Sequence, residues 1–203
     1  MRSRFFDAFL AEERKLYGQE VVPKDALRFA WYADVIDPAA EHFPDSENCR
    51  FNSGAQLAAS VLSGIRSSLI RVAQAAKLDD IGMSVLAGDT YKYLTRPEVR
   101  CEADQRVLTE LSSASTEGRK VVLVAHSMGG IVSFSALQKA SVIQAQYPVR
   151  ASAFITIGTQ IGVTEVLQGL LGQFTKPPVP LPPSIGEWVN FRNAGDRLSF
   201  ATE

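Results

Sequence analysis

A run of apolar residues that leads straight into a helix constrains the fold of this chain more than any other feature. Residues 121–125 (VVLVA) are continuously apolar, without the apolar-polar alternation of a half-exposed strand. This pattern is typical of a parallel strand that is covered on both faces. Apolar residues then recur at helical spacing, at Ile131, Phe134, Leu137 and Ile143. A buried strand followed directly by a helix predicts an α/β sheet.

The remaining pattern alternates short strands with helices, which supports the same α/β class. Further strands are expected at 27–32 (LRFAWY), 154–157 and 188–191. An amphipathic helix is expected at the start of the chain, where apolar residues lie at near-helical spacing: Phe5, Phe6, Phe9, Leu10 and Leu16. Other helices are expected after a Ser53/Gln56 capping box as far as Ala76, from Pro97 to Ala114 with Gly118 as a stop signal, and across 164–174.

Size and charge limit the classes of protein that this chain can represent. A chain of 203 residues with 46% hydrophobic content fits one domain, 1–203, around one core. A net charge of -1 supplies no positive field for nucleic acid or anionic lipid. No stretch has the length of a membrane span or a secretory leader, so we expect a cytoplasmic protein. Cys49 and Cys101 are too few for a disulfide framework or a thiolate metal cluster, although one bridge stays open, and no metal or cofactor is expected.

The residues around Ser127 match the Gly-x-Ser-x-Gly pattern, with Ala125 in place of the first glycine. A strand that turns at once into a helix strains the turn residue and crowds the positions two before and two after it. Ala125 and Gly129 are small enough for those positions, and Gly130 would let the helix lie close to the sheet. Ser127 is then the candidate nucleophile at the carboxyl edge of the sheet, beside the positive end of a helix. The Met128 N–H would supply one donor to an oxyanion.

The same residues also allow interpretations in which no serine is a nucleophile. Ser127 could be a helix N-cap, a role that serine fills often. The chain contains a second Ser-x-Gly at 184–186, but a proline-rich segment precedes it instead of a strand, so Ser184 is expected in a loop. His126 is the variable residue of the turn, and we expect it to pack or hydrogen-bond beside Ser127 rather than to act as its general base.

The run VVLVAHSMGG, which contains Ser127, resembles the nucleophile elbow of lipase- and esterase-like α/β hydrolases. Residues 154–159 (FITIGT) look like the strand after that elbow, whose end lines the pocket in this superfamily. Residues 188–196 (WVNFRNAGD) look like the next strand, whose end carries the acid in many bacterial members. Three shorter segments are similar to parts of a bacterial hydrolase group: Gly88-Asp89-Thr90, Tyr93-Leu94 and Trp31 with Ala33-Asp34.

The resemblance covers about residues 27–200 and implies a serine hydrolase that acts on carboxylic esters. The implied architecture is a three-layer sandwich around a mostly parallel sheet, incomplete at both ends. Asp196 is the implied acid that would orient the general base, although 193–196 is also an ordinary polar turn. Asp89 is a weaker candidate, since it could equally cap the next segment.

The chain departs from the family pattern where the general base should be. The family orders its triad as serine, then acid, then histidine, yet no histidine follows Ser127. The upstream His-Gly oxyanion loop is absent too, and His42 is left as an unconventional base. We favour a segment of a longer hydrolase over a short protein that lost its chemistry. In either case the isolated chain is expected to be weakly active or inactive.

Residues 160–186 form an insert between two predicted strands, and its apolar residues share one helical face: Val163, Val166, Leu167, Leu170, Leu171 and Phe174. This insert could form a lid over Ser127, which would suit a small lipophilic ester, or the apolar face could simply pack on the core. The rival function is a non-catalytic interaction or scaffold protein. In that case Ser127 only caps a helix, and the proline-rich segment 177–183 offers a surface to a proline-recognising partner.

Overall fold

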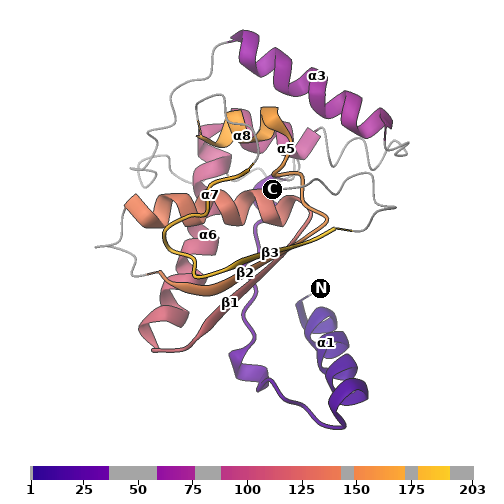
Figure 1. Cartoon of the computed structure of the whole chain (residues 1–203), viewed down its shortest axis with the longest axis vertical. Helices are drawn as coiled ribbons and strands as arrows, with labels where there is room; N and C mark the ends of the chain where they lie inside the picture. The colour runs from indigo at the N-terminus through magenta and orange to yellow at the C-terminus, as the bar shows by residue number, and fades with distance from the viewer. Residues whose placement is uncertain (1, 37–58, 76–87, 143–148, 172–177, 193–203) are drawn as a thin grey trace. The chain divides into compact units, whose positions relative to one another are not determined.

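The computed structural model describes residues 2–36, 59–75, 88–142, 149–171 and 178–192. The chain divides into two compact units, Met1–Trp31 and Tyr32–Glu203. Figure 1 labels the helices and strands of both units. No helix in the described ranges combines the length and apolar character needed to cross a membrane.

The first unit begins with helix α1 (Arg2–Tyr17), where an amphipathic helix was predicted. Phe6 and Leu10, one turn apart, are buried, whereas Phe9 and Leu16 on other sides of the helix are exposed. The helix ends at Gly18, which has a φ of +74° and whose N–H donates to the Arg14 carbonyl at 2.9 Å. Glycine tolerates this backbone conformation best, so the stop is local in origin.

The strand predicted at 27–32 is wrong. Leu27 has an extended backbone, but no strand in the described ranges pairs with this segment, and its side chains are half-buried or exposed. Aromatic packing is found instead, because the ring of Phe29 lies edge-on to Phe6 at 6.2 Å and stacks on Trp31 at 5.9 Å. A short apolar run predicts an extended segment equally well whether or not a neighbouring strand exists to complete the ladder.

The second unit contains a parallel sheet of strands β1 (Val121–His126), β2 (Ala151–Ile157) and β3 (Trp188–Phe191), in that order. Figure 1 shows the three strands side by side. Val124 pairs with Ile155, and Ile155 with Val189. Helix α7 (Met128–Val142) connects β1 to β2, and α8 (Thr164–Leu171) lies between β2 and β3. The predicted strands at these positions and the α/β class are confirmed.

The other helices of the second unit are α2 (Ala33–Ile36), α3 (Ala59–Ala75), α5 (Thr90–Thr95) and α6 (Pro97–Thr116). Pro97 stands at the first helical position, as predicted, where its missing N–H costs nothing. After the helix, Gly118 adopts a φ of +69° and donates its N–H to Ser115 at 3.1 Å. Helix α3 confirms a helix within 53–76, whereas Ser53 and Gln56 lie outside the described residues.

One face of the sheet packs against α7 and forms the centre of the core. The rings of Phe154 and Trp188, on adjacent strands, are 5.3 Å apart, and Phe134 of α7 lies 5.6 Å from Trp188. The Trp188 indole N–H donates to the Thr156 hydroxyl at 2.9 Å, so its polar atom is satisfied inside this cluster. The aromatic cluster joins β2, β3 and α7.

The side chains on the opposite face of the sheet are exposed in the described part of the second unit, so the prediction that β1 is covered on both faces is wrong. Val122 and Val124 are 52% and 58% exposed, and Phe191 of β3, on the same face, is 57% exposed. An uninterrupted apolar run indicates that both faces of a strand are apolar. It does not indicate whether another element lies on each face, because that depends on residues far away in the sequence.

Cys101 of α6 is buried and disulfide-bonded. The chain's other cysteine, Cys49, lies outside the described residues. Disulfides are typical of proteins from oxidising compartments and rare in cytosolic ones, so this bond counts against the predicted cytoplasmic location. Within the described ranges, no group of three or more histidine, cysteine or acidic side chains could hold a metal ion.

Candidate active site

The chain reverses at Ser127, between the last residue of β1 and the first residue of α7. Ser127 has a φ of 51° and is the one non-glycine residue with a positive φ in the described part of the chain. Its N–H donates to the Ile157 carbonyl at 2.9 Å, and its carbonyl accepts from the Gly130 N–H at 3.0 Å. The same residue therefore ends the strand ladder and starts the helix. The sharp turn expected here is confirmed, and the role of nucleophile stays a prediction.

Small residues surround the turn as expected. Ala125 is buried, and a Cβ on Gly129 would lie 3.3 Å from the hydroxyl oxygen of Tyr32. A Cβ on Gly130 would lie only 2.4 Å from Oγ1 of Thr159, the second residue after β2. Since real Cβ atoms essentially never come so close to another atom, Gly130 is what allows α7 to lie this near to the end of β2.

We expect Ser127→Gly to raise the free energy of unfolding by up to about 1 kcal/mol, because glycine adopts a positive φ without steric cost. Ser127→Ala keeps the Cβ and is expected to bring no such gain. Urea unfolding of the two variants and the wild type measures the difference. A glycine variant no more stable than the alanine variant would contradict the strain at this residue.

Met128 begins α7, so its N–H is among the first-turn groups that have no acceptor within the helix. The positive end of the helix dipole lies at the same place, which favours a developing negative charge beside Ser127. The arrangement therefore has the chemical character expected of an oxyanion site. Thr159, which lies against this first turn, is fully buried, and its hydroxyl has no hydrogen-bond partner in the described part of the molecule.

Tyr32 is the residue at this site that sequence reasoning missed. It was assigned to a strand, yet its hydroxyl oxygen lies at the first turn of α7, beside Gly129. Burial raises the pKa of Tyr32 to about 12, so its hydroxyl stays protonated at neutral pH. No motif or spacing connects this tyrosine to the elbow, because the two are distant in sequence and meet only in the folded chain.

The acid and base candidates are not brought together with Ser127 by the described residues. Asp196 and His42 both lie outside them. Asp89 precedes α5 and makes no side-chain capping bond there, but its carboxylate lies 3.6 Å from the Lys92 ammonium. His126 is exposed, on the open face of the sheet with Val124.

Ser184 serves as an internal control for the elbow. It lies in a loop, as predicted, and is buried. Its hydroxyl donates to the Leu137 carbonyl at 3.1 Å, which ties the loop to α7. The same Ser-x-Gly sequence thus has a packing role where no strand leads into it.

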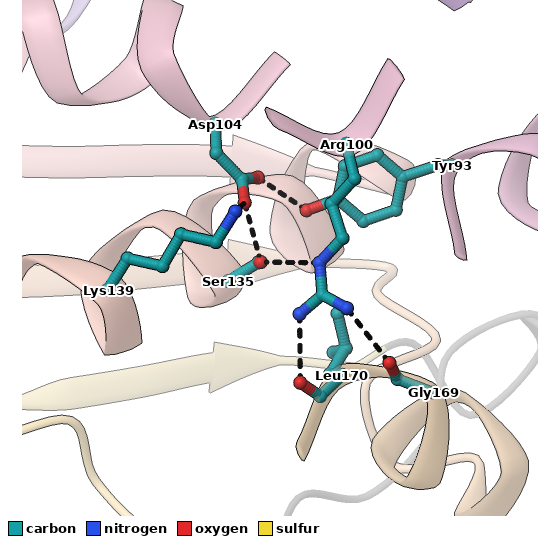
Figure 2. Close-up of polar contacts among 7 residues, drawn as sticks. All are labelled: Tyr93, Arg100, Asp104, Ser135, Lys139, Gly169 and Leu170. Atoms are coloured by element: carbon teal, nitrogen blue, oxygen red, sulfur yellow. Dashed lines mark hydrogen bonds and ion pairs between the residues drawn. The ribbon is translucent and has the colours of Figure 1, made fainter. Parts of the chain in front are cut away.

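A buried carboxylate connects the helix of the elbow to its neighbours. Asp104 of α6 is 1% exposed and accepts from the Tyr93 hydroxyl at 2.5 Å and the Ser135 hydroxyl at 2.8 Å. The Lys139 ammonium lies 2.7 Å from the same carboxylate. Figure 2 shows the three partners converging on Asp104. Burial, and then the charge of Asp104, raise the pKa of Tyr93 well above its usual value.

Arg100, one turn before Asp104, extends this cluster to α8. Its Nε donates to the Ser135 hydroxyl at 3.2 Å, and its terminal nitrogens donate to the carbonyls of Gly169 and Leu170 at 2.9 and 2.8 Å (Figure 2). These carbonyls belong to the last turn of α8, where no intrahelical donor remains. The Arg100/Asp104 cluster, which also includes Tyr93, Ser135 and Lys139, therefore joins α5, α6, α7 and α8.

Helix α8 lies in the proposed lid, and three of its apolar residues are buried, Val166, Leu167 and Leu170, whereas Leu171 is half-buried. Val166 and Leu167 are fully enclosed, and the helix packs against α3 and α5. A Cβ on Gly169 would lie 3.2 Å from Leu94 of α5, so the two helices are in close contact. The movement of a lid over Ser127 stays a prediction.

Comparison of the chain with protein-family models, with curated proteins and with solved structures found no match. The class of the fold therefore comes from the parallel sheet and its helices, and the case for a function comes from the geometry at Ser127.

Proposed function

We propose that this chain is the core of an α/β-hydrolase-type serine hydrolase that cleaves carboxylic esters through Ser127. The observation that carries the proposal is the φ of 51° at a serine between a parallel strand and the helix that follows it. A serine that merely caps a helix has a β-region backbone and a negative φ. The N-cap alternative therefore does not account for this conformation, whereas a nucleophile elbow requires it.

The nucleophile and one oxyanion donor of the proposed reaction are present at the turn. Oγ of Ser127 bonds to the ester carbonyl carbon, and the electron pair of the C=O bond moves to the oxygen. The Met128 N–H and the positive end of α7 stabilise that oxyanion. The serine proton passes to a base and then to the leaving alcohol as its C–O bond breaks. Asp196 remains the proposed acid that orients the base.

The open face of the sheet supports the larger architecture. Helices normally cover both faces of a parallel sheet. Val122, Val124 and Phe191 are exposed apolar residues on the face opposite α7, where a third layer would bury them. The proposed protein is thus a three-layer sandwich, and a small lipophilic ester remains the proposed substrate, with 160–186 as the proposed lid.

A fluorophosphonate probe tests the nucleophile, because its phosphorus bonds to an activated serine with loss of fluoride. We expect slow labelling of the wild-type chain, measured as a mass increase of the intact protein, and none in Ser127→Ala. Ser184→Ala is the matched control and should label like the wild type, since Ser184 is buried and bonded to Leu137.

No histidine follows Ser127 in this sequence, and this leads to a second prediction about the same reaction. Added imidazole is expected to accelerate labelling of Ser127, because it supplies a general base from solution. A wild-type chain that stays unlabelled with imidazole would favour the non-catalytic scaffold instead. Fast labelling without imidazole would mean that a residue which the sequence does not identify acts as the general base.

A further inference from the structure

The site has a second potential donor to an oxyanion. Gly129 lies in the first turn of α7, next to Met128, and the Tyr32 hydroxyl oxygen is 3.3 Å from the position of a Cβ on Gly129. The hydroxyl therefore borders the helix start on which the proposed chemistry depends. Tyr32 belongs to the same compact unit as Ser127.

Tyr32 is held at this place by the short helix that follows it. Its carbonyl accepts from the Val35 N–H at 3.0 Å, which starts α2. The Asp34 carboxylate of α2 lies 2.5 Å from the Arg106 guanidinium of α6. Hydrogen bonding to Arg106 also lowers the pKa of Asp34, so the ion pair persists at neutral pH. Helix α6 in turn packs against α7.

The Tyr32 hydroxyl is available to a ligand. Within the described part of the chain it has no hydrogen-bond partner, yet it is not among the fully enclosed polar atoms that lack one. Its pKa of about 12 keeps the proton on the oxygen throughout the neutral range. A protonated phenol without an acceptor can donate to an oxygen that arrives with a substrate.

We infer that the Tyr32 hydroxyl is the second donor to the oxyanion that forms at Ser127, beside the Met128 N–H. This inference rests on the proposed function. Acyl-transfer sites on this kind of elbow hold the oxyanion with two donors, and the first turn of α7 supplies one of them. In this chain the Tyr32 hydroxyl, which lies beside Gly129 in that same turn, supplies the other. Tyr32 donates only a hydrogen bond and keeps its proton, so the atoms and charges of the reaction are unchanged.

The rate of fluorophosphonate labelling tests the inference, because charge also develops on the phosphoryl oxygen. Tyr32→Phe keeps the ring and removes the donor, and we expect it to slow labelling roughly 100-fold, in line with the loss of one oxyanion donor. Tyr17→Phe is the matched control, since that side chain is 65% exposed on α1. It should label at the wild-type rate. The thermal midpoint of Tyr32→Phe should match the wild type.

A second variant separates hydrogen bonding from packing if Tyr32→Phe is less stable. Gly129→Ala places a methyl group 3.3 Å from the Tyr32 oxygen, which must then shift by a few tenths of an ångström. We expect slower labelling in this variant. In the Tyr32→Phe background the oxygen is gone, so Gly129→Ala should cause little further loss. Equal fold-losses in both backgrounds would mean that Gly129 does not act through Tyr32, which would overturn the inference.

The outcomes distinguish the inference from the function on which it rests. If Ser127→Ala abolishes labelling but Tyr32→Phe labels at the wild-type rate, Tyr32 is not a donor and the serine hydrolase proposal stands. If the wild type acquires no label that depends on Ser127, the proposed function fails and the role of Tyr32 fails with it.

Discussion

Asp104→Ala is expected to lower the free energy of unfolding by about 3 kcal/mol, the largest loss that we foresee for a single substitution. Removing one partner of a buried ion pair typically costs about 3–5 kcal/mol. Asp104 is 1% exposed, while the side chain of Lys139 is 22% exposed and can reach water once its partner is gone. The lower end of the range therefore applies. Urea unfolding, extrapolated to water, measures the change.

Two controls show whether the loss comes from the charge or from the hydrogen bonds. Asp104→Asn keeps the shape and one acceptor oxygen for Tyr93 or Ser135, and should cost less than alanine. Asp104→Leu combined with Lys139→Met removes both charges, and should recover much of the stability because paired apolar replacements are often neutral. An alanine variant within about 0.5 kcal/mol of the wild type, as for an ordinary surface substitution, would contradict the buried role of Asp104.

Under the proposed function, the Arg100/Asp104 cluster would position the turn at Ser127. Ser135 and Lys139 belong to α7, whose first turn borders Ser127. Losing the carboxylate loosens α7 against α6 and is therefore expected to slow labelling of Ser127 as well.

Gly130→Ala is expected to lower the free energy of unfolding by about 2–3 kcal/mol, because the new methyl group overlaps Thr159. The Cβ would lie 2.4 Å from Oγ1 and 2.9 Å from Cβ of that threonine, which is fully buried and has little room to move. Thr159→Gly removes both atoms, so Gly130→Ala should cost little in that background. Thr159→Ala removes only Oγ1 and should give partial relief. Unfolding curves of the single and double variants measure the coupling.

Gly64→Ala is the matched control for this prediction. Gly64 also lies within a helix, α3, but a Cβ there would meet no atom within 4 Å. The change should therefore stabilise the protein by about 0.5–1 kcal/mol, as alanine does in an open helical position. If both alanines had the same effect, the close contact between Gly130 and Thr159 would not be the cause.

The sequence predicted those parts of the fold and the site that depend on neighbouring residues. The strands at β1, β2 and β3 and the helices α6 and α7 follow from periodicity and from signals such as Pro97 and Gly118, which act within one or two turns. The reversal at Ser127 is local in the same sense. A strand, a helix and the small residues between them leave the chain one conformation at the turn.

The sequence could not predict which segments meet across the fold. Residues 27–32 look like a strand but find no partner strand in the described chain, and β1 looks buried on both faces but is open on one. An isolated Asp104 or Arg100 in an amphipathic helix predicts a solvated face, and only the arrival of Tyr93, Ser135 and the end of α8 makes them a buried cluster.

The candidate site also has one part that follows from neighbouring residues and one part that depends on tertiary packing. The residues next to Ser127 were enough to identify it as the candidate and to predict its backbone conformation, because steric strain at a turn is a short-range property. The position of the Tyr32 hydroxyl beside Gly129 was decided only by the tertiary structure, since α2, α6 and α7 must pack before those residues become neighbours. Contacts between distant segments depend on the whole core, and no local pattern records them.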